Sequence, residues 1–124
     1  MSSLFSRYQG FAYFLMRVFF GLLFACHGAQ KLFGLLGGEK KALASLMGVA
    51  GVVEFFGGLA IALGIFTSWA AFLSVGQMAV AYFMAHASQD FWPIQNRGEL
   101  ALLYCFGFLV IMTRGSGKWS LRSG

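Results

Sequence analysis

Seven polar residues that could do chemistry lie in or beside long apolar runs of this sequence. They are Arg17, His27, Lys31, Glu54, His86, Asn96 and Glu99. The histidines and carboxylates could take up and release protons, and the cations and the amide could hold an oxygen-bearing ligand. An ionisable group inside a bilayer costs about 2.5–3.5 kcal/mol on insertion scales unless it is paired. We therefore expect these charges to face protein and to have partners.

The first apolar run places its cations on one face of a helix. Arg17, Gly21, Gly28 and Lys31 align on one stripe when the chain turns once in about 3.6 residues. The other faces carry Leu, Phe and Val. A membrane helix has this pattern when its polar side packs against protein.

The second apolar run contains a single charge, Glu54. Gly51, Gly58 and Ala62 lie on the same helical stripe as this carboxylate. Small residues four apart let helix backbones approach closely in membranes. We expect Glu54 to point at another helix rather than at lipid.

Composition excludes an ordinary soluble domain. The chain has 124 residues, of which 59% are hydrophobic and only 10% charged, against about 25% charged in soluble domains. The net charge of +5 could indicate nucleic acid, but the basic residues lie at the ends of the apolar runs, where lipid headgroups attract them. The expected partner is therefore the lipid bilayer and not nucleic acid.

The runs predict an all-α membrane protein, an antiparallel bundle of four transmembrane helices forming a single domain over residues 1–124. The expected spans are 11–33, 43–66, 69–87 and 98–113. The first three are long enough for a hydrocarbon core of roughly 30 Å, and the fourth is shorter. The very short turn at Thr67-Ser68 predicts that the second and third spans are antiparallel neighbours.

An even number of spans places both termini on one side of the membrane. That side carries Arg7, Arg114, Lys118 and Arg122 and no acidic residue. The positive-inside rule then favours cytoplasmic termini for a multi-pass protein of the bacterial inner membrane.

Alternating spans bring distant polar residues to one membrane face. These are His27, Gln30, Lys31, His86, Asn96 and Glu99, with Glu54 deeper and Arg17 deep from the other side. We expect Arg17 to pair with Glu54 and Lys31 to pair with Glu99. The alternative is that these charges only hold the helices together, as polar contacts do in many membrane proteins.

The residue types raise two further kinds of site, a metal site and a pair of redox-active cysteines. The residue types that could bind a metal ion are those of His27, His86, Glu54 and Glu99. They are not arranged in a short-range motif such as HxxxH or ExxH, so no metal site is expected. Cys26 and Cys105 lie inside apolar runs, where we interpret them as small packing residues, with a redox pair as the alternative.

Five motifs, in this order over the region from Arg17 to Leu121, resemble the DoxX family of small bacterial membrane proteins. They are RVFFGLLFACHGAQKLFG at 17–34, EFFGG at 54–58, YFMAH at 82–86, PIQNRGELALLY at 93–104 and GSGKWSL at 115–121. The resemblance implies a four-helix bundle in the inner membrane. It places the family's polar positions at Arg17, Lys31, Glu54, His86, Asn96 and Glu99. The family pattern usually ends in an Asp after Ser-Leu, where this chain has Arg122.

The resemblance also implies a membrane subunit linked to quinone or sulfur redox chemistry and to oxidative-stress assemblies. The first hypothesis is therefore a subunit of a redox-linked complex, with redox proteins as partners. Its polar pocket would bind a quinone-like or sulfur-containing molecule through Arg17, His27, Lys31, Glu54, His86, Asn96 and Glu99. Glu54, Glu99 and His86 would be the candidates for catalytic proton transfer. Two alternatives stay open: a structural accessory subunit, and a small-metabolite transporter that acts as a homo-oligomer.

Overall fold

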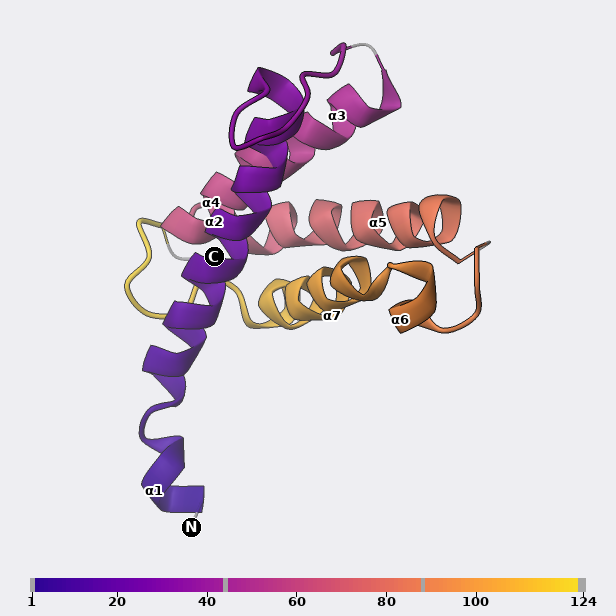
Figure 1. The fold of residues 1–124 in the computed structure, drawn as a ribbon. Coiled ribbons are helices and arrows are strands. Elements are labelled where there is room, and N and C mark those ends of the chain that lie inside the picture. Colours follow the sequence, from indigo (N-terminus) through magenta and orange to yellow (C-terminus); the bar gives the residue numbers. More distant parts are fainter. Residues whose placement is uncertain (1, 44, 88, 123–124) are drawn as a thin grey trace.

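The computed structural model describes residues 2–43, 45–87 and 89–122, and this part of the chain is helical without strands (Figure 1). Its elements are α1 (Ser2–Ser6), α2 (Gln9–Phe33), α3 (Leu46–Val52), η1 (Val53–Gly57), α4 (Gly58–Leu63), α5 (Thr67–Ala85), α6 (Pro93–Asn96) and α7 (Glu99–Arg114). Helices cover the four expected ranges to within three residues at each end. α2, the helix from Leu46 to Leu63 and α5 are long and apolar enough to cross a membrane.

The long helices end where the sequence supplies caps. α2 is capped at its C-terminus by Gly34, which adopts a left-handed conformation (φ 68°) and donates its backbone N–H to the carbonyl of Gln30. The N-cap of the next helix is Ser45, whose hydroxyl accepts from the backbone N–H of Gly48 at 3.0 Å. Its C-cap is Gly64, again left-handed (φ 76°). These caps set the lengths of the first two membrane-crossing helices.

The second of these helices contains a π-helical turn. α3, η1 and α4 follow one another without a break, and the π-helix η1 includes Glu54. π-helical turns are rare and occur frequently at functional sites. Sequence periodicity does not reveal this turn, because a stripe read at 3.6 residues per turn assumes a regular α-helix.

Small residues bring α2 against this helix, as the sequence predicts. A side chain at Gly58 would run into the backbone of Gly21 and Ala25, and one at Gly28 would run into the backbone of Phe55. α2 therefore packs along η1 and α4 at backbone contact. The glycine stripe is used within the chain.

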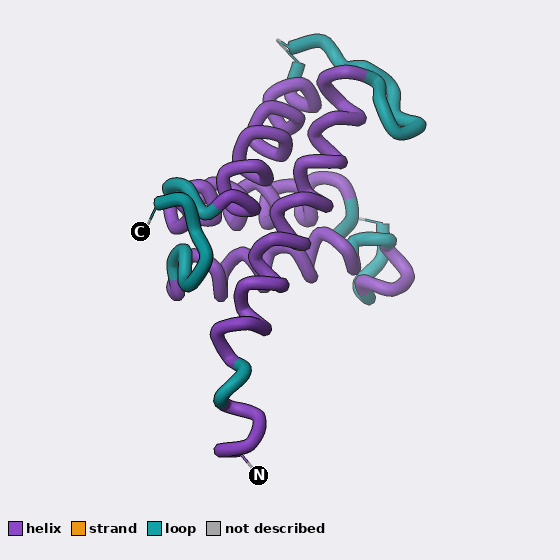
Figure 2. The backbone as a smooth tube through the Cα atoms, turned by 90° about the vertical axis from the view of Figure 1, so that its left-hand side faces the viewer, coloured by secondary structure: helices purple, strands orange, loops and turns teal. Residues whose placement is uncertain are grey.

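The helices form two antiparallel hairpins that cross each other. α2 pairs with the helix from α3 to α4, and α5 pairs with α7. Figure 1 shows the second hairpin lying steeply across the first, and Figure 2 shows the same arrangement from the side. α5 packs mainly along α7 and contacts η1 and α4 less extensively. The second and third spans are therefore neighbours, as predicted, but they cross rather than form an antiparallel pair. Phe66 in a left-handed conformation (φ 48°) and the turn around it redirect the chain at this point.

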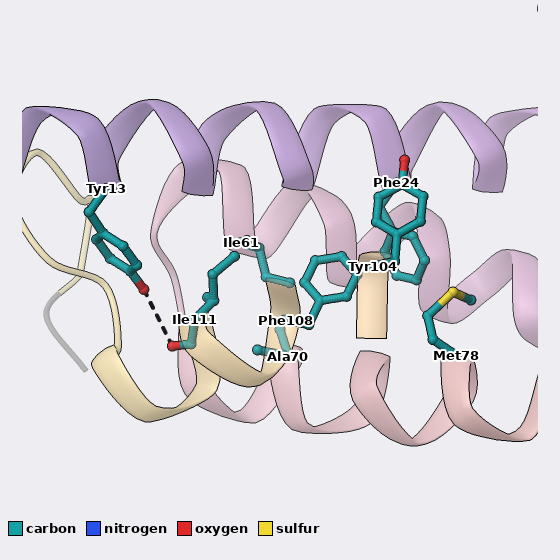
Figure 3. Packing of buried hydrophobic residues seen from close by; sticks show 9 residues of the cluster. Tyr13, Phe24, Ile61, Ala70, Met78, Tyr104, Phe108 and Ile111 are labelled. Atoms are coloured by element: carbon teal, nitrogen blue, oxygen red, sulfur yellow. Dashed lines mark hydrogen bonds between the residues drawn. The ribbon is translucent and has the colours of Figure 1, made fainter. Parts of the chain in front are cut away.

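The hydrophobic core lies where the two hairpins cross. Figure 3 shows Phe24 of α2, Ile61 of α4 and Phe108 and Ile111 of α7 packed together. Each of these four side chains is at most 1% exposed. Large apolar side chains elsewhere, such as Phe83, are exposed on the outer faces. An apolar exterior around a small core suits a chain surrounded by lipid.

Candidate ligand cavity

A cavity of about 560 Å³ lies between the C-terminal half of α2, the segment α3–η1, the later turns of α5 and the start of α7. Its polar lining consists of His27, Lys31, Glu54, Gln77, His86, Arg97 and Tyr104. The rest of the lining is apolar and includes Leu46, Met47, Met78, Met84 and Leu100. Ligand sites typically have volumes of about 300–1,000 Å³ and a largely apolar lining with a few polar groups.

Glu54 is the centre of the polar lining. Lys31 of α2 donates to Glu54 Oε2 at 2.5 Å, and Gln77 Nε2 of α5 donates to the same oxygen at 2.7 Å. The carboxylate is 2% exposed and comes from η1. One oxygen atom thus joins three helices by accepting from one charged donor and one neutral donor.

The other oxygen of this carboxylate has a different environment. Glu54 Oε1 is buried and has no hydrogen-bond partner within the described residues. A buried acceptor left unpaired costs about 1–3 kcal/mol. Because Glu54 lines the cavity, a ligand there could supply the missing donor.

His86 is oriented by the segment before α7. Its Nδ1 lies 3.1 Å from the carbonyl oxygen of Asn96. A carbonyl only accepts, so Nδ1 carries a hydrogen in this contact. When the ring is neutral, its Nε2 is therefore an acceptor.

Asn96 itself is a structural residue of this segment. Its side chain is fully buried, and its Nδ2 donates to the Tyr82 hydroxyl at 3.1 Å and to the Asp90 carbonyl at 3.0 Å. Its Oδ1 accepts from the backbone N–H of Gly98 at 2.8 Å. Asn96 orients His86 through its backbone carbonyl, and its side chain does not line the cavity.

Lys31 pairs with Glu54, so the expected pair between Lys31 and Glu99 is wrong. Glu99 is exposed in the first turn of α7 and is outside the cavity lining. Gln30 also turns away, since its Nε2 donates to the Leu36 carbonyl at 3.0 Å. Of the residues expected at one membrane face, His27, Lys31 and His86 line the cavity together with Glu54.

Arg17 lies elsewhere, and its expected pairing with Glu54 is also wrong. The guanidinium is 1% exposed. It donates to the carbonyl oxygens of Ala62 (3.3 Å), Ser116 (2.5 Å), Lys118 (3.2 Å) and Trp119 (3.1 Å). The segment after α7 supplies three of these carbonyls because it folds back onto the chain, with Leu121 N–H bonded to Leu63 O. The partners of Arg17 are thus backbone carbonyl oxygens, and not the Glu54 carboxylate that the residue types suggested.

Three lining residues were not proposed as ligand-binding from sequence. Gln77 is a polar side chain in the middle of an apolar run, and that contrast was the available signal. Tyr104 has no sequence feature that marks it as a ligand-binding residue. Arg97 reaches the cavity from a left-handed backbone position (φ 64°) before α7, which no spacing rule anticipates.

The structure offers little geometry for metal or disulfide chemistry. Among residues 2–43, 45–87 and 89–122, no three His, Cys, Asp or Glu side chains gather closely enough to hold a metal ion. Cys26 is exposed and Cys105 half-buried, and both are free thiols.

Three long apolar helices and a partly open cavity lined by charged groups define a helical membrane protein with a polar site among its helices. The DoxX family model matches residues 12–87. A protein of Haemophilus influenzae described as uncharacterized is 35% identical over 122 residues, which cover 93% of this chain and 91% of that protein. The chain belongs to the DoxX family. No solved structure matches it.

Proposed function

We propose that this protein is an inner-membrane subunit of a redox-linked complex and that it binds a small quinone-like molecule in the cavity. The observation that carries this proposal is the cavity itself. A charged and partly unpaired group, Glu54, lies at one part of a largely apolar space of about 560 Å³. A molecule with a polar ring and an apolar remainder matches that division.

The charges of the site favour a neutral ligand over a sulfur oxyanion. The ammonium of Lys31 is already paired with Glu54. The unpaired oxygen Oε1 would repel an anion placed beside it. Arg97 is exposed, so water weakens its attraction for an anion.

The chain's own groups have separate roles in this proposal. Glu54 and His86 are the cavity groups able to take up or release a proton beside a ligand, and Lys31 holds Glu54 in place. A bound quinone would supply two-electron redox chemistry. Glu99 is outside the cavity, so it is not a member of the proposed site.

The test is to fill the cavity and to measure binding in lipid nanodiscs by native mass spectrometry with decylubiquinol as the probe. Ala50 lines the cavity, whereas its neighbour Val49 is exposed and does not. A50F should weaken binding at least tenfold, and V49F should bind as the wild type does. If wild type does not bind the probe, or if A50F binds it equally well, the proposed function is wrong.

A structural accessory role is the second candidate, and one observation favours it. Lys31, Glu54 and Gln77 join α2, η1 and α5 through one oxygen atom, which would stabilise the fold without any ligand. Under this role E54Q lowers the amount of protein in the membrane and no ligand co-purifies. Under the ligand-binding role E54Q and H86A abolish the membrane activity while the protein level is maintained.

The transporter alternative has less support. It would require an oligomer to enclose a path, and the glycines that could form a helix interface between chains contact residues of the same chain. Gly21 and Gly28 are examples, packed against Gly58 and Phe55.

The topology of four spans with cytoplasmic termini is part of the proposal. α7 has 16 residues, which is short for a span, and it ends at Arg114. Lys118 and Trp119 lie beside the first turns of α2, so the C-terminal segment packs against the start of the first long helix. A periplasm-specific reporter fused to the C-terminus should be inactive, and an active fusion would refute this orientation.

A further inference from the structure

The polar groups of the cavity differ in the hydrogen-bond partner that a ligand would have to supply. Glu54 Oε1 needs a donor, because both donors that reach this carboxylate bind Oε2. Nε2 of a neutral His86 ring is likewise an acceptor, because Nδ1 donates to the Asn96 carbonyl. Two cavity residues on different helical segments therefore have an acceptor to offer.

The other polar groups of the cavity do not favour a ligand that carries only acceptors. Lys31 has further N–H groups and is 23% exposed, so a ligand oxygen of any kind can accept from it. The hydroxyl of Tyr104 can donate or accept. Because these groups serve a hydroxyl and a carbonyl alike, discrimination rests on the acceptor that is buried and unpaired.

A cationic donor is disfavoured in the same space. Lys31 and Arg97 are positive and line the cavity, and Glu54 is the one acidic residue among the lining residues. An ammonium would add a third positive charge to a site with one negative charge. The donor that fits is a neutral hydroxyl attached to an apolar body.

We infer that the cavity selects ligands that carry a hydroxyl donor on the ring over ligands that carry only acceptors, so that it holds the hydroquinone form in preference to the quinone form. This inference rests on the proposed function and adds which redox form of the ligand is bound more tightly. A site with a buried acceptor discriminates strongly against a ligand that leaves this acceptor unpaired.

The preference can be measured without redox chemistry. The probes are para-nonylphenol and its methyl ether, which share the ring and the tail. The ether has a methyl group in place of the hydroxyl hydrogen, so it can accept but not donate. Native mass spectrometry in nanodiscs should show that the phenol binds about tenfold or more tightly than the ether. Equal binding of the two probes would overturn this inference while leaving the cavity function intact. Binding of neither probe would count against both proposals.

E54Q gives the sharper test, because it exchanges an acceptor for a donor. Lys31 and Gln77 both donate toward the position of Oε2. The oxygen of the new amide should therefore face them, and its NH₂ group should face the cavity. The ratio of phenol to ether affinity should fall to about one or reverse, and this ratio cancels the different partitioning of the two probes into lipid.

The matched control is E99Q, which makes the same chemical change at an exposed carboxylate outside the cavity. It should keep the wild-type ratio. An unchanged ratio in folded E54Q, or the same fall in E99Q, would refute the role of Glu54 Oε1. Thermal unfolding of each variant in the same nanodiscs shows that the compared proteins are folded.

Discussion

Arg17 and Glu54 are the two most deeply buried charges described in this protein, at 1% and 2% exposure, and their surroundings are opposite. Four backbone carbonyls surround the guanidinium. The carboxylate has two donors on one oxygen and none on the other, which belongs to a cavity-lining residue.

The difference separates a structural charge from a functional one. Arg17 Nε also has no partner, but Arg17 does not line the cavity, so a ligand there cannot reach it. A buried charge that the protein has surrounded with its own oxygens stabilises the fold. A buried charge with an unmet acceptor, on a residue that lines a cavity, is a candidate for binding a ligand.

The largest loss of stability should come from removing Lys31, the cation that pairs with Glu54. K31M leaves the carboxylate buried with only Gln77 as a donor, so the free energy of unfolding should fall by about 3–5 kcal/mol. Thermal unfolding in nanodiscs measures this loss. Adding E54Q to K31M should recover much of it, because no uncompensated charge remains. No recovery in the double variant would show that Lys31 acts mainly through packing.

Removing the buried charge of Arg17 should lower stability without affecting ligand binding. R17M leaves the carbonyls of Ala62, Ser116, Lys118 and Trp119 without this donor, and the free energy of unfolding should fall by about 3 kcal/mol. Binding of decylubiquinol by the folded fraction should not change. A variant that stays stable but loses binding would remove the distinction between the two charges.

A smaller loss should follow from pushing α2 away from η1. A side chain at Gly28 meets the backbone of Phe55, the residue after Glu54, so G28A should cost about 1–3 kcal/mol and weaken probe binding. Gly76 on α5 is the control, because an added Cβ meets nothing there. G76A should be neutral or stabilising by up to about 1 kcal/mol, and equal losses in both variants would argue against the close contact.

The smallest effect should come from the segment that encloses Arg17. Thr67 Oγ1 and Ser116 Oγ are 2.7 Å apart and buried. T67V removes this contact at nearly constant volume and should cost about 1 kcal/mol of unfolding free energy, with probe binding unchanged. A loss of binding in T67V would indicate that the two regions are coupled.

The sequence predicted the helices well because their signals are local. Apolar runs, the caps at Gly34 and Gly64 and the small residues facing Gly21 all depend on neighbours along one helix. Of the residues predicted to gather at one membrane face, His27, Lys31 and His86 line the cavity together with Glu54.

Partner choice could not be predicted in the same way. Arg17 is satisfied by backbone carbonyls, which are present in every residue and leave no mark in residue types. Lys31 reaches Glu54 rather than Glu99 because α2 packs along the π-helical segment, and neither this segment nor the crossing of the hairpins has a sequence pattern of its own.

The contacts of Arg17 also set an order of events during synthesis. The first helix is made early, but the Ser116 carbonyl that binds Arg17 lies 99 residues further along the chain. At about 5–20 residues per second, translation needs roughly 5–20 s to reach it. Throughout this interval the arginine is without most of its acceptors, so the insertion machinery, lipid headgroups or water must solvate it until the last segment arrives.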